Sequence, residues 1–138
     1  MQVDNNLDNY YLDSYFSIVN ETNYFKDLGE GIFLSEKVFK PILKSHPFII
    51  VSRPHSLQKL RELGYKTFSP YIDETYDTII DDSERLFAII NEVKRLCNLS
   101  PTELNEFLTY VKNIVEHNYE LLISKKNSSV ERFVTKLL

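Results

Sequence analysis

Three residues at a predicted helix start have the types and spacing of an anion-binding site. Ser35, Glu36 and Lys37 come directly before the apolar residues of a helix pattern. The first turn of a helix has unpaired backbone N–H groups and a partial positive charge, so a lysine there adds to a site that already favours anions. The segment predicts binding of a phosphate-bearing ligand. The alternative is a plain helix start, with Ser35 as the N-cap and Glu36 and Lys37 in solvent.

Further polar residues follow the predicted strands. Glu21 lies in the loop after the first strand and Arg53 in the loop after the second. In open parallel sheets ligands bind outside the carboxyl ends of the strands, so these loops are expected to meet. A cleft with cations, helix starts and carboxylates suits a nucleotide sugar, with cations for the diphosphate and a carboxylate for the ribose. The alternatives are solvated polar loops, or Arg53 paired with the acidic loop at 73–77.

The apolar pattern predicts the elements that position these residues. Strands are expected at 15–19, 48–51 and 65–68, the second buried on both faces. Helices are expected after the N-caps Ser35 and Ser56. The alternation of strand and helix predicts a small parallel sheet with right-handed crossovers.

The C-terminal half has a helical pattern. One helix opens at Asp82 or Ser83 and has an apolar stripe that comprises Leu86, Phe87, Ile89, Ile90, Val93 and Leu96. A capping box of Ser100 and Glu103, with proline at the first helical position, starts a long helix at 101 that runs to about 123. Another capping signal at Ser128 predicts a last helix. We expect one α/β domain over residues 1–138: a partly ordered lead-in at 1–13, a small parallel-sheet unit of Rossmann-like, three-layer type at 14–80, and a helical annex at 81–138.

Composition and charge exclude several classes of protein. The net charge of −4 gives no basic surface for a nucleic-acid backbone. No export signal and no apolar run of membrane-spanning length is found, and the single Cys97 suits a reducing compartment, so a soluble cytoplasmic protein is expected. The three histidines lack the close spacing of a zinc site, so neither a metal nor a cofactor is expected.

Two segments resemble a known enzyme family. The pattern YFSIVNET, a loop and then GIFLSEKVFKPILKSHPFIIV is similar to a stretch of fucosyltransferases in which a strand ends in Phe-Glu-Asn-Ser and Thr-Glu-Lys opens a helix that leads to a Val-Pro-Val strand. The resemblance covers about a quarter of the chain. In that family the stretch belongs to the nucleotide-sugar-binding, C-terminal half of a GT-B glycosyltransferase.

The resemblance implies roles for the candidate residues. Glu36 would contact ribose hydroxyls, Lys37 the diphosphate, and Glu21 a polar wall of the donor pocket. Ser52 and Arg53 stand where the family usually has a glycine. We expect only the donor-binding half, so that a partner protein supplies the acceptor domain, or the chain binds without turnover, or the site is vestigial.

A different class of function also fits the sequence. The long helix carries an apolar stripe that would suit a noncatalytic protein-interaction domain. The stripe comprises Leu104, Phe107, Leu108, Val111, Ile114 and Val115.

Overall fold

The computed structural model describes residues 10–21 and 34–125. In chain order the elements are β1 (Ser17–Asn20), α2 (Glu36–Leu43), β2 (Phe48–Val51), α3 (Ser56–Glu62), the 3₁₀-helix η1 (Thr75–Thr78), α4 (Asp82–Cys97) and α5 (Pro101–Ser124). The fold is mixed α/β, with more helix than strand. The loop expected between the first strand and the helix at Ser35, the helix predicted after Ser128 and most of the lead-in at 1–13 lie outside the described residues.

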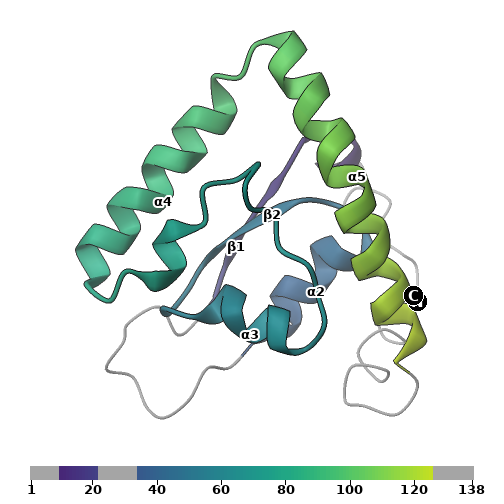
Figure 1. Cartoon of the computed structure of the whole chain (residues 1–138), viewed down its shortest axis with the longest axis horizontal. Helices are drawn as coiled ribbons and strands as arrows, with labels where there is room; N and C mark the ends of the chain where they lie inside the picture. The colour runs from purple at the N-terminus through teal and green to yellow at the C-terminus, as the bar shows by residue number, and fades with distance from the viewer. Residues whose placement is uncertain (1–9, 22–33, 126–138) are drawn as a thin grey trace.

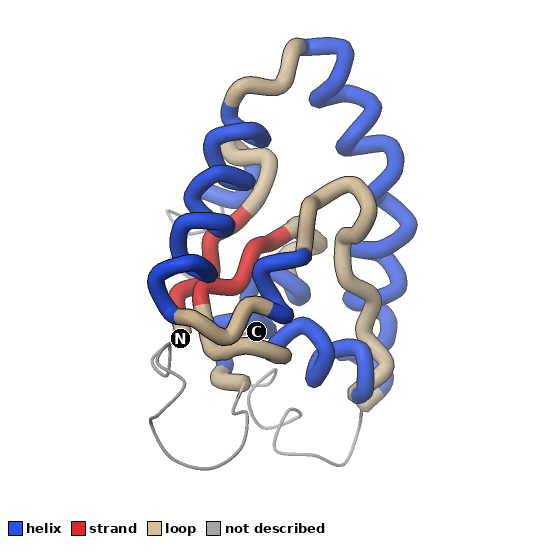
Figure 2. Tube along the Cα trace, turned by 60° about the vertical axis from the view of Figure 1, so that its left-hand side comes forward, coloured by secondary structure: helices blue, strands red, loops and turns tan. Residues whose placement is uncertain are grey.

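The sheet has two parallel strands. β1 pairs with β2 in a register that sets Ser17 opposite Phe48 and Asn20 opposite Val51. The strand prediction at 48–51 is confirmed, while β1 begins two residues later than predicted. Figures 1 and 2 show the strands side by side between α4 and α5, with α2 and α3 near one end. The buried residues of these elements form a common core, in which Ile49 is completely buried.

The third predicted strand, at 65–68, is wrong. In the structure this segment is irregular, and side chains hold its backbone in place of a neighbouring strand. The amide of Asn118 on α5 accepts a hydrogen bond from Lys66 N (2.8 Å) and donates one to Lys66 O (2.9 Å). The Glu74 carboxylate accepts from the backbone N–H groups of Phe68 and Ser69, both at 3.0 Å.

Side chains also occupy the second edge of β2. The Tyr76 hydroxyl accepts a hydrogen bond from Ile50 N (3.4 Å), and Arg85 Nε donates to Ser52 O just beyond the strand (3.0 Å). Buried backbone polar groups must be paired, and these two side chains satisfy groups that a further strand would otherwise pair. The predicted three-stranded sheet is therefore a two-stranded one in the described part of the chain.

Local cap signals predicted the helix starts well, with one correction. The capping box of α5 is formed by Ser100 and Glu103 as predicted, and Asp81 caps α4. Ser56 does not cap α3 but is its first residue. The Asp77 carboxylate caps this helix instead, because its two oxygens accept from Leu57 N (2.8 Å) and Gln58 N (3.1 Å).

The two long helices differ in how well their apolar patterns predict the buried face. On α4 the buried side chains include Arg85 and Glu92, whereas Leu86, Phe87 and Ile90 are 41%, 67% and 42% exposed. On α5 the stripe proposed for a partner faces the core: Phe107, Val111 and Val115 are buried. Since α5 packs against α2, most of this stripe is covered, while Leu108 is 36% exposed.

Two buried tyrosines provide a test of this packing. Burial raises the pKa of Tyr65 to about 12, and its hydroxyl has no hydrogen-bond partner among the described residues. Tyr65→Phe should leave the free energy of unfolding unchanged or raise it by up to about 1 kcal/mol, because an unpaired buried hydroxyl is costly. Tyr76→Phe should lower it by about 1–2 kcal/mol, because Ile50 N–H loses its partner. Urea unfolding of both variants measures the difference, and equal losses would contradict the assignment.

The loss of stability at alkaline pH provides a second test of the burial of Tyr65. A pKa that rises from 10.0 in the unfolded chain to about 12 in the fold means that the unfolded state ionises first. The associated stability is present below pH 10 and is lost as the pH rises through about 12. In Tyr65→Phe, the free energy of unfolding should not show this part of the decrease at alkaline pH.

Candidate functional site

The predicted helix start at Ser35 forms as expected. Ser35 is the N-cap of α2, and its hydroxyl accepts a hydrogen bond from Lys37 N at 3.2 Å. Glu36 is the first helical residue and its side chain is exposed. Ser35 thus performs the capping role that a plain helix start requires.

Lys37 extends to the carboxyl end of the sheet. Its ammonium group donates to the carbonyl oxygen of Asn20, the last residue of β1, at 3.2 Å. The side chain therefore lies at the edge of the sheet where the sequence placed a ligand.

A surface hollow lies beside Lys37. It has a volume of about 390 Å³ and is formed by the 10–20 segment and one face of α2. Its lining includes two cations, Lys37 and Lys40, which are three residues apart and so neighbours on the helix surface. The other lining residues are Tyr10, Tyr11, Ser14, Phe16, Ser17, Ile18, Val19, Asn20 and Pro41. None of these described residues is Asp, Glu, His or Cys, so the hollow favours anions and offers no obvious general base.

A buried histidine holds one wall of the hollow. His46 Nε2 lies 2.9 Å from the Ser14 carbonyl and Nδ1 lies 2.6 Å from the Ser17 hydroxyl. Since a carbonyl accepts, Nε2 carries a proton and donates it to Ser14 O. The ring of Tyr11 packs edge-on against the His46 ring, with centroids 5.3 Å apart. These contacts fix the 11–17 segment against the start of β2.

Burial at this wall also affects the tyrosine. Desolvation raises the pKa of Tyr11, and the nearby charge of Lys44 partly offsets the rise. Tyr11 therefore stays protonated at neutral pH. It presents a neutral ring and a hydroxyl that can donate or accept.

Glu21 lies at the same sheet edge but outside the hollow. Its backbone N–H donates to Val51 O at 3.0 Å, which continues the pairing of the strands. The side chain is buried, and Oε1 has no hydrogen-bond partner among the described residues. Glu21 does not line the hollow.

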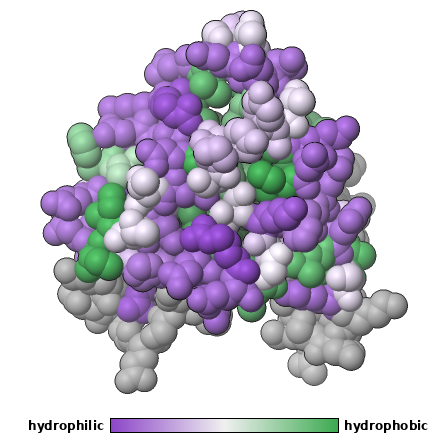
Figure 3. Space-filling model, in the orientation of Figure 1, coloured by the Kyte–Doolittle hydropathy of each residue, from purple (hydrophilic) through white to green (hydrophobic). Residues whose placement is uncertain are grey.

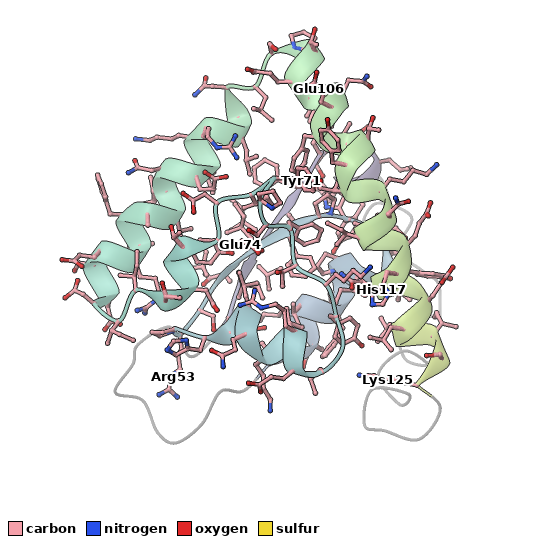
Figure 4. All side chains as sticks on the ribbon, in the orientation of Figure 1. Arg53, Tyr71, Glu74, Glu106, His117 and Lys125 are labelled. Atoms are coloured by element: carbon pink, nitrogen blue, oxygen red, sulfur yellow. The ribbon has the colours of Figure 1, made fainter. Side chains whose placement is uncertain are left out.

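Arg53 does not line the hollow either. It follows Ser52 in the turn into α3, is half-buried, and lies at the outer margin of the molecule (Figure 4). Ser35 and Glu36 are also absent from the lining of the hollow. Of the five residues predicted for the site, Lys37 alone lines the hollow in the described part of the chain. Lys40 and the two tyrosines were not predicted, although the spacing of Lys40 from Lys37 was a usable signal.

Arg85 occupies the carboxyl end of β2. It is 1% exposed, and besides Ser52 O its guanidinium donates to Ile79 O and Ile80 O, both at 3.1 Å. It also pairs with Asp82 at 2.8 Å. The backbone just beyond the carboxyl end of β2 is therefore held by an arginine that binds backbone carbonyls.

Two of the acidic residues in the 73–77 segment are structural. Glu74 and Asp77 are buried, and both bind backbone N–H groups, as described above. Desolvation raises the pKa of Glu74, opposed by hydrogen bonds that it accepts, first of all from Phe68 N. Arg61 lies 4.0 Å from Glu74 and 3.8 Å from Asp77. These contacts support α3 and the 65–69 segment. Figure 4 shows Glu74 near the centre of the molecule.

No protein-family model, curated protein or solved structure was found to match this chain. Among residues 10–21 and 34–125, no three His, Cys, Asp or Glu side chains gather as metal ligands. Over the same residues, no helix has both the length and the hydropathy needed to cross a membrane.

Proposed function

We propose that this chain binds a small phosphate-bearing ligand in the hollow beside Lys37, with the nucleoside diphosphate part of a nucleotide sugar as the ligand class. One observation carries the proposal. Lys37 and Lys40 line a hollow of about 390 Å³ in which no described lining residue is acidic. Two ammonium groups one helical turn apart suit neighbouring phosphates of a diphosphate.

The remaining lining residues suit the nucleoside. The rings of Tyr10 and Tyr11 offer flat faces for a base, since aromatic stacking tolerates different bases. The side chains of Asn20, Ser14 and Ser17 provide hydrogen-bonding groups for sugar hydroxyls. In this arrangement the phosphates lie on α2 and the nucleoside lies on the 10–20 segment.

The proposal is one of binding and not of turnover. The described lining has neither a carboxylate nor a histidine that would deprotonate an acceptor hydroxyl. Glu21, Glu36 and Arg53 lie outside the hollow, so the roles that the fucosyltransferase resemblance implies for Glu21 and Glu36, and the phosphate role proposed for Arg53, have no support from the geometry. A partner protein with an acceptor site would have to supply the remaining chemistry.

Thermal melting with nucleotides tests the proposal. GDP or UDP at about one hundred times its dissociation constant should stabilise the fold by about 2.7 kcal/mol. Lys37→Ala and Lys40→Ala should each reduce or abolish the shift without unfolding the protein, because both side chains are at the surface. Lys112→Ala, at an exposed position of α5 outside the hollow, is the matched control and should retain the shift.

The outcomes separate the ligand classes. A shift with GDP or UDP that survives Lys37→Ala would contradict the proposed site. An equal shift with inorganic phosphate alone would show that the nucleoside adds nothing and would contradict the ligand class.

A protein-interaction domain is the second candidate, on a different surface from the one predicted. Leu86, Phe87 and Ile90 are exposed on α4, and Leu86 and Ile90 are one turn apart. Figure 3 shows hydrophobic residues over the lower part of α4, on an otherwise mainly hydrophilic face. If no nucleotide changes the melting temperature and sedimentation depends on concentration, this candidate is favoured.

A further inference from the structure

A second hollow, which has the form of a groove, lies between the 70–73 loop and the facing ends of α4 and α5. It has a volume of about 360 Å³ and shares no lining residue with the hollow beside Lys37. The lining residues are Pro70, Tyr71, Asp73, Arg95, Leu99, Glu103, Glu106, Phe107 and Tyr110. Figure 4 places Tyr71 between the two helices and Glu106 near the start of α5, and Figure 3 shows residues of intermediate hydropathy in this wedge.

The floor of this groove is aromatic and apolar. The rings of Tyr71 and Tyr110 stack with centroids 4.8 Å apart and an interplanar angle of 7°. Tyr110 is 53% exposed, so part of its ring remains open to solvent. Leu99 and Phe107 pack below as part of the core or against it. A stacked pair with an exposed ring gives a flat surface of the kind on which a planar cation stacks.

The rim of the groove is negatively charged. Asp73, Glu103 and Glu106 contribute carboxylates, against the single cation Arg95. That cation is already neutralised, because its guanidinium pairs with Glu92, which lies outside the lining. Hydrogen bonds from Thr75, first from its backbone N–H, lower the pKa of Asp73 and keep it ionised. The Glu106 carboxylate forms no ion pair and no hydrogen bond with another described residue.

We propose that this groove is the docking site for an arginine side chain presented by a partner protein. A guanidinium is planar, stacks on tyrosine and binds carboxylates with a directed fork of donors, whereas an ammonium is a point charge. The exposed Tyr110 ring would stack with the guanidinium, and Glu106 would pair with it. The acidic rim repels phosphate and nucleic acid, so this surface complements a basic partner and is independent of the nucleotide proposal.

Titration of the full chain with matched peptides tests this proposal. The probes are blocked Gly-Ser-Arg-Ser-Gly, its lysine analogue and its citrulline analogue, followed by ¹H–¹⁵N NMR at low ionic strength. We expect saturable shifts of the amide signals at 71–73 and 103–110 with the arginine peptide, weaker ones with lysine and none with the uncharged, isosteric citrulline.

Two substitutions localise the binding. Glu106→Gln should weaken it about twofold to fivefold, as for one partly exposed ion pair. Tyr110→Leu should weaken it by a similar factor through loss of stacking. Glu120→Gln removes an exposed carboxylate from the same helix outside the groove and should leave it unchanged. Equal binding of the lysine and arginine peptides would indicate a nonspecific acidic patch and would overturn the proposal. Binding of the citrulline peptide, or competition of millimolar Mg²⁺ with the arginine peptide at constant ionic strength, would also overturn it. The same holds if no amide signal shifts or if neither substitution weakens binding.

Discussion

Replacing Arg85 with alanine should lower the free energy of unfolding by about 3–5 kcal/mol, the range expected when one member of a buried polar network is removed. The side chain is 1% exposed and donates to three backbone carbonyls from two separate segments, those of Ser52, Ile79 and Ile80. Without it these acceptors lose their partner, Asp82 loses its ion pair, and a large cavity opens between α4 and β2. Urea unfolding followed by circular dichroism measures the loss.

Two further variants separate the causes of this loss. Arg95→Ala removes an arginine of the same helix whose side chain is 49% exposed, and it should cost less than about 1 kcal/mol. Arg85→Lys keeps the charge but lacks the forked donors that reach several carbonyls, so it should show most of the alanine effect. A loss below 1 kcal/mol in Arg85→Ala would mean that the carbonyls find other partners.

Features that depend on neighbouring residues were predictable from the sequence. The caps at Ser35 and Ser100 need a hydroxyl and a free N–H two or three residues away, and both form as predicted. The β2 strand was recognisable because Phe48–Val51 is a short apolar run bounded by turn residues. Each of these signals lies within about six residues of the feature that it specifies.

Features set by distant residues were not predictable in the same way. The segment 65–68 has strand-like composition, yet its backbone partners are side chains from Glu74 and from Asn118, which is 52 positions from Lys66. The burial of Arg85 depends on carbonyls at the end of β2, 33 positions away. The apolar pattern of α4 therefore misidentified part of its buried face.

The candidate site shows the same division. The position of Lys37 in the first turn of α2 followed from the Ser35 cap, whereas its contact with Asn20 was not predicted. The hollow itself depends on how the segment at 10–17 packs against α2 and His46, which no local pattern specifies. Glu21, Glu36 and Arg53 have suitable chemistry for a nucleotide, but they do not line that hollow.

Asn118→Ala should be the second large effect, with a loss of about 2–4 kcal/mol in the free energy of unfolding. Asn118 is 1% exposed and its amide bonds both the N–H and the carbonyl of Lys66, so alanine leaves both backbone groups without their partner. Asn113→Ala, at an exposed position of the same helix, should change stability by less than about 0.5 kcal/mol.

Hydrogen exchange distinguishes this mechanism from general destabilisation. If Asn118 replaces a strand partner, the amide of Lys66 should lose protection in Asn118→Ala beyond the global loss, while the amide of Ile50, bonded to Tyr76, follows the global loss only. Uniform loss at both amides would mean that Asn118 acts through core packing alone. Selective loss at Lys66 would establish that a single side-chain amide holds this extended segment against α5, in the position where the sequence pattern suggests a third strand.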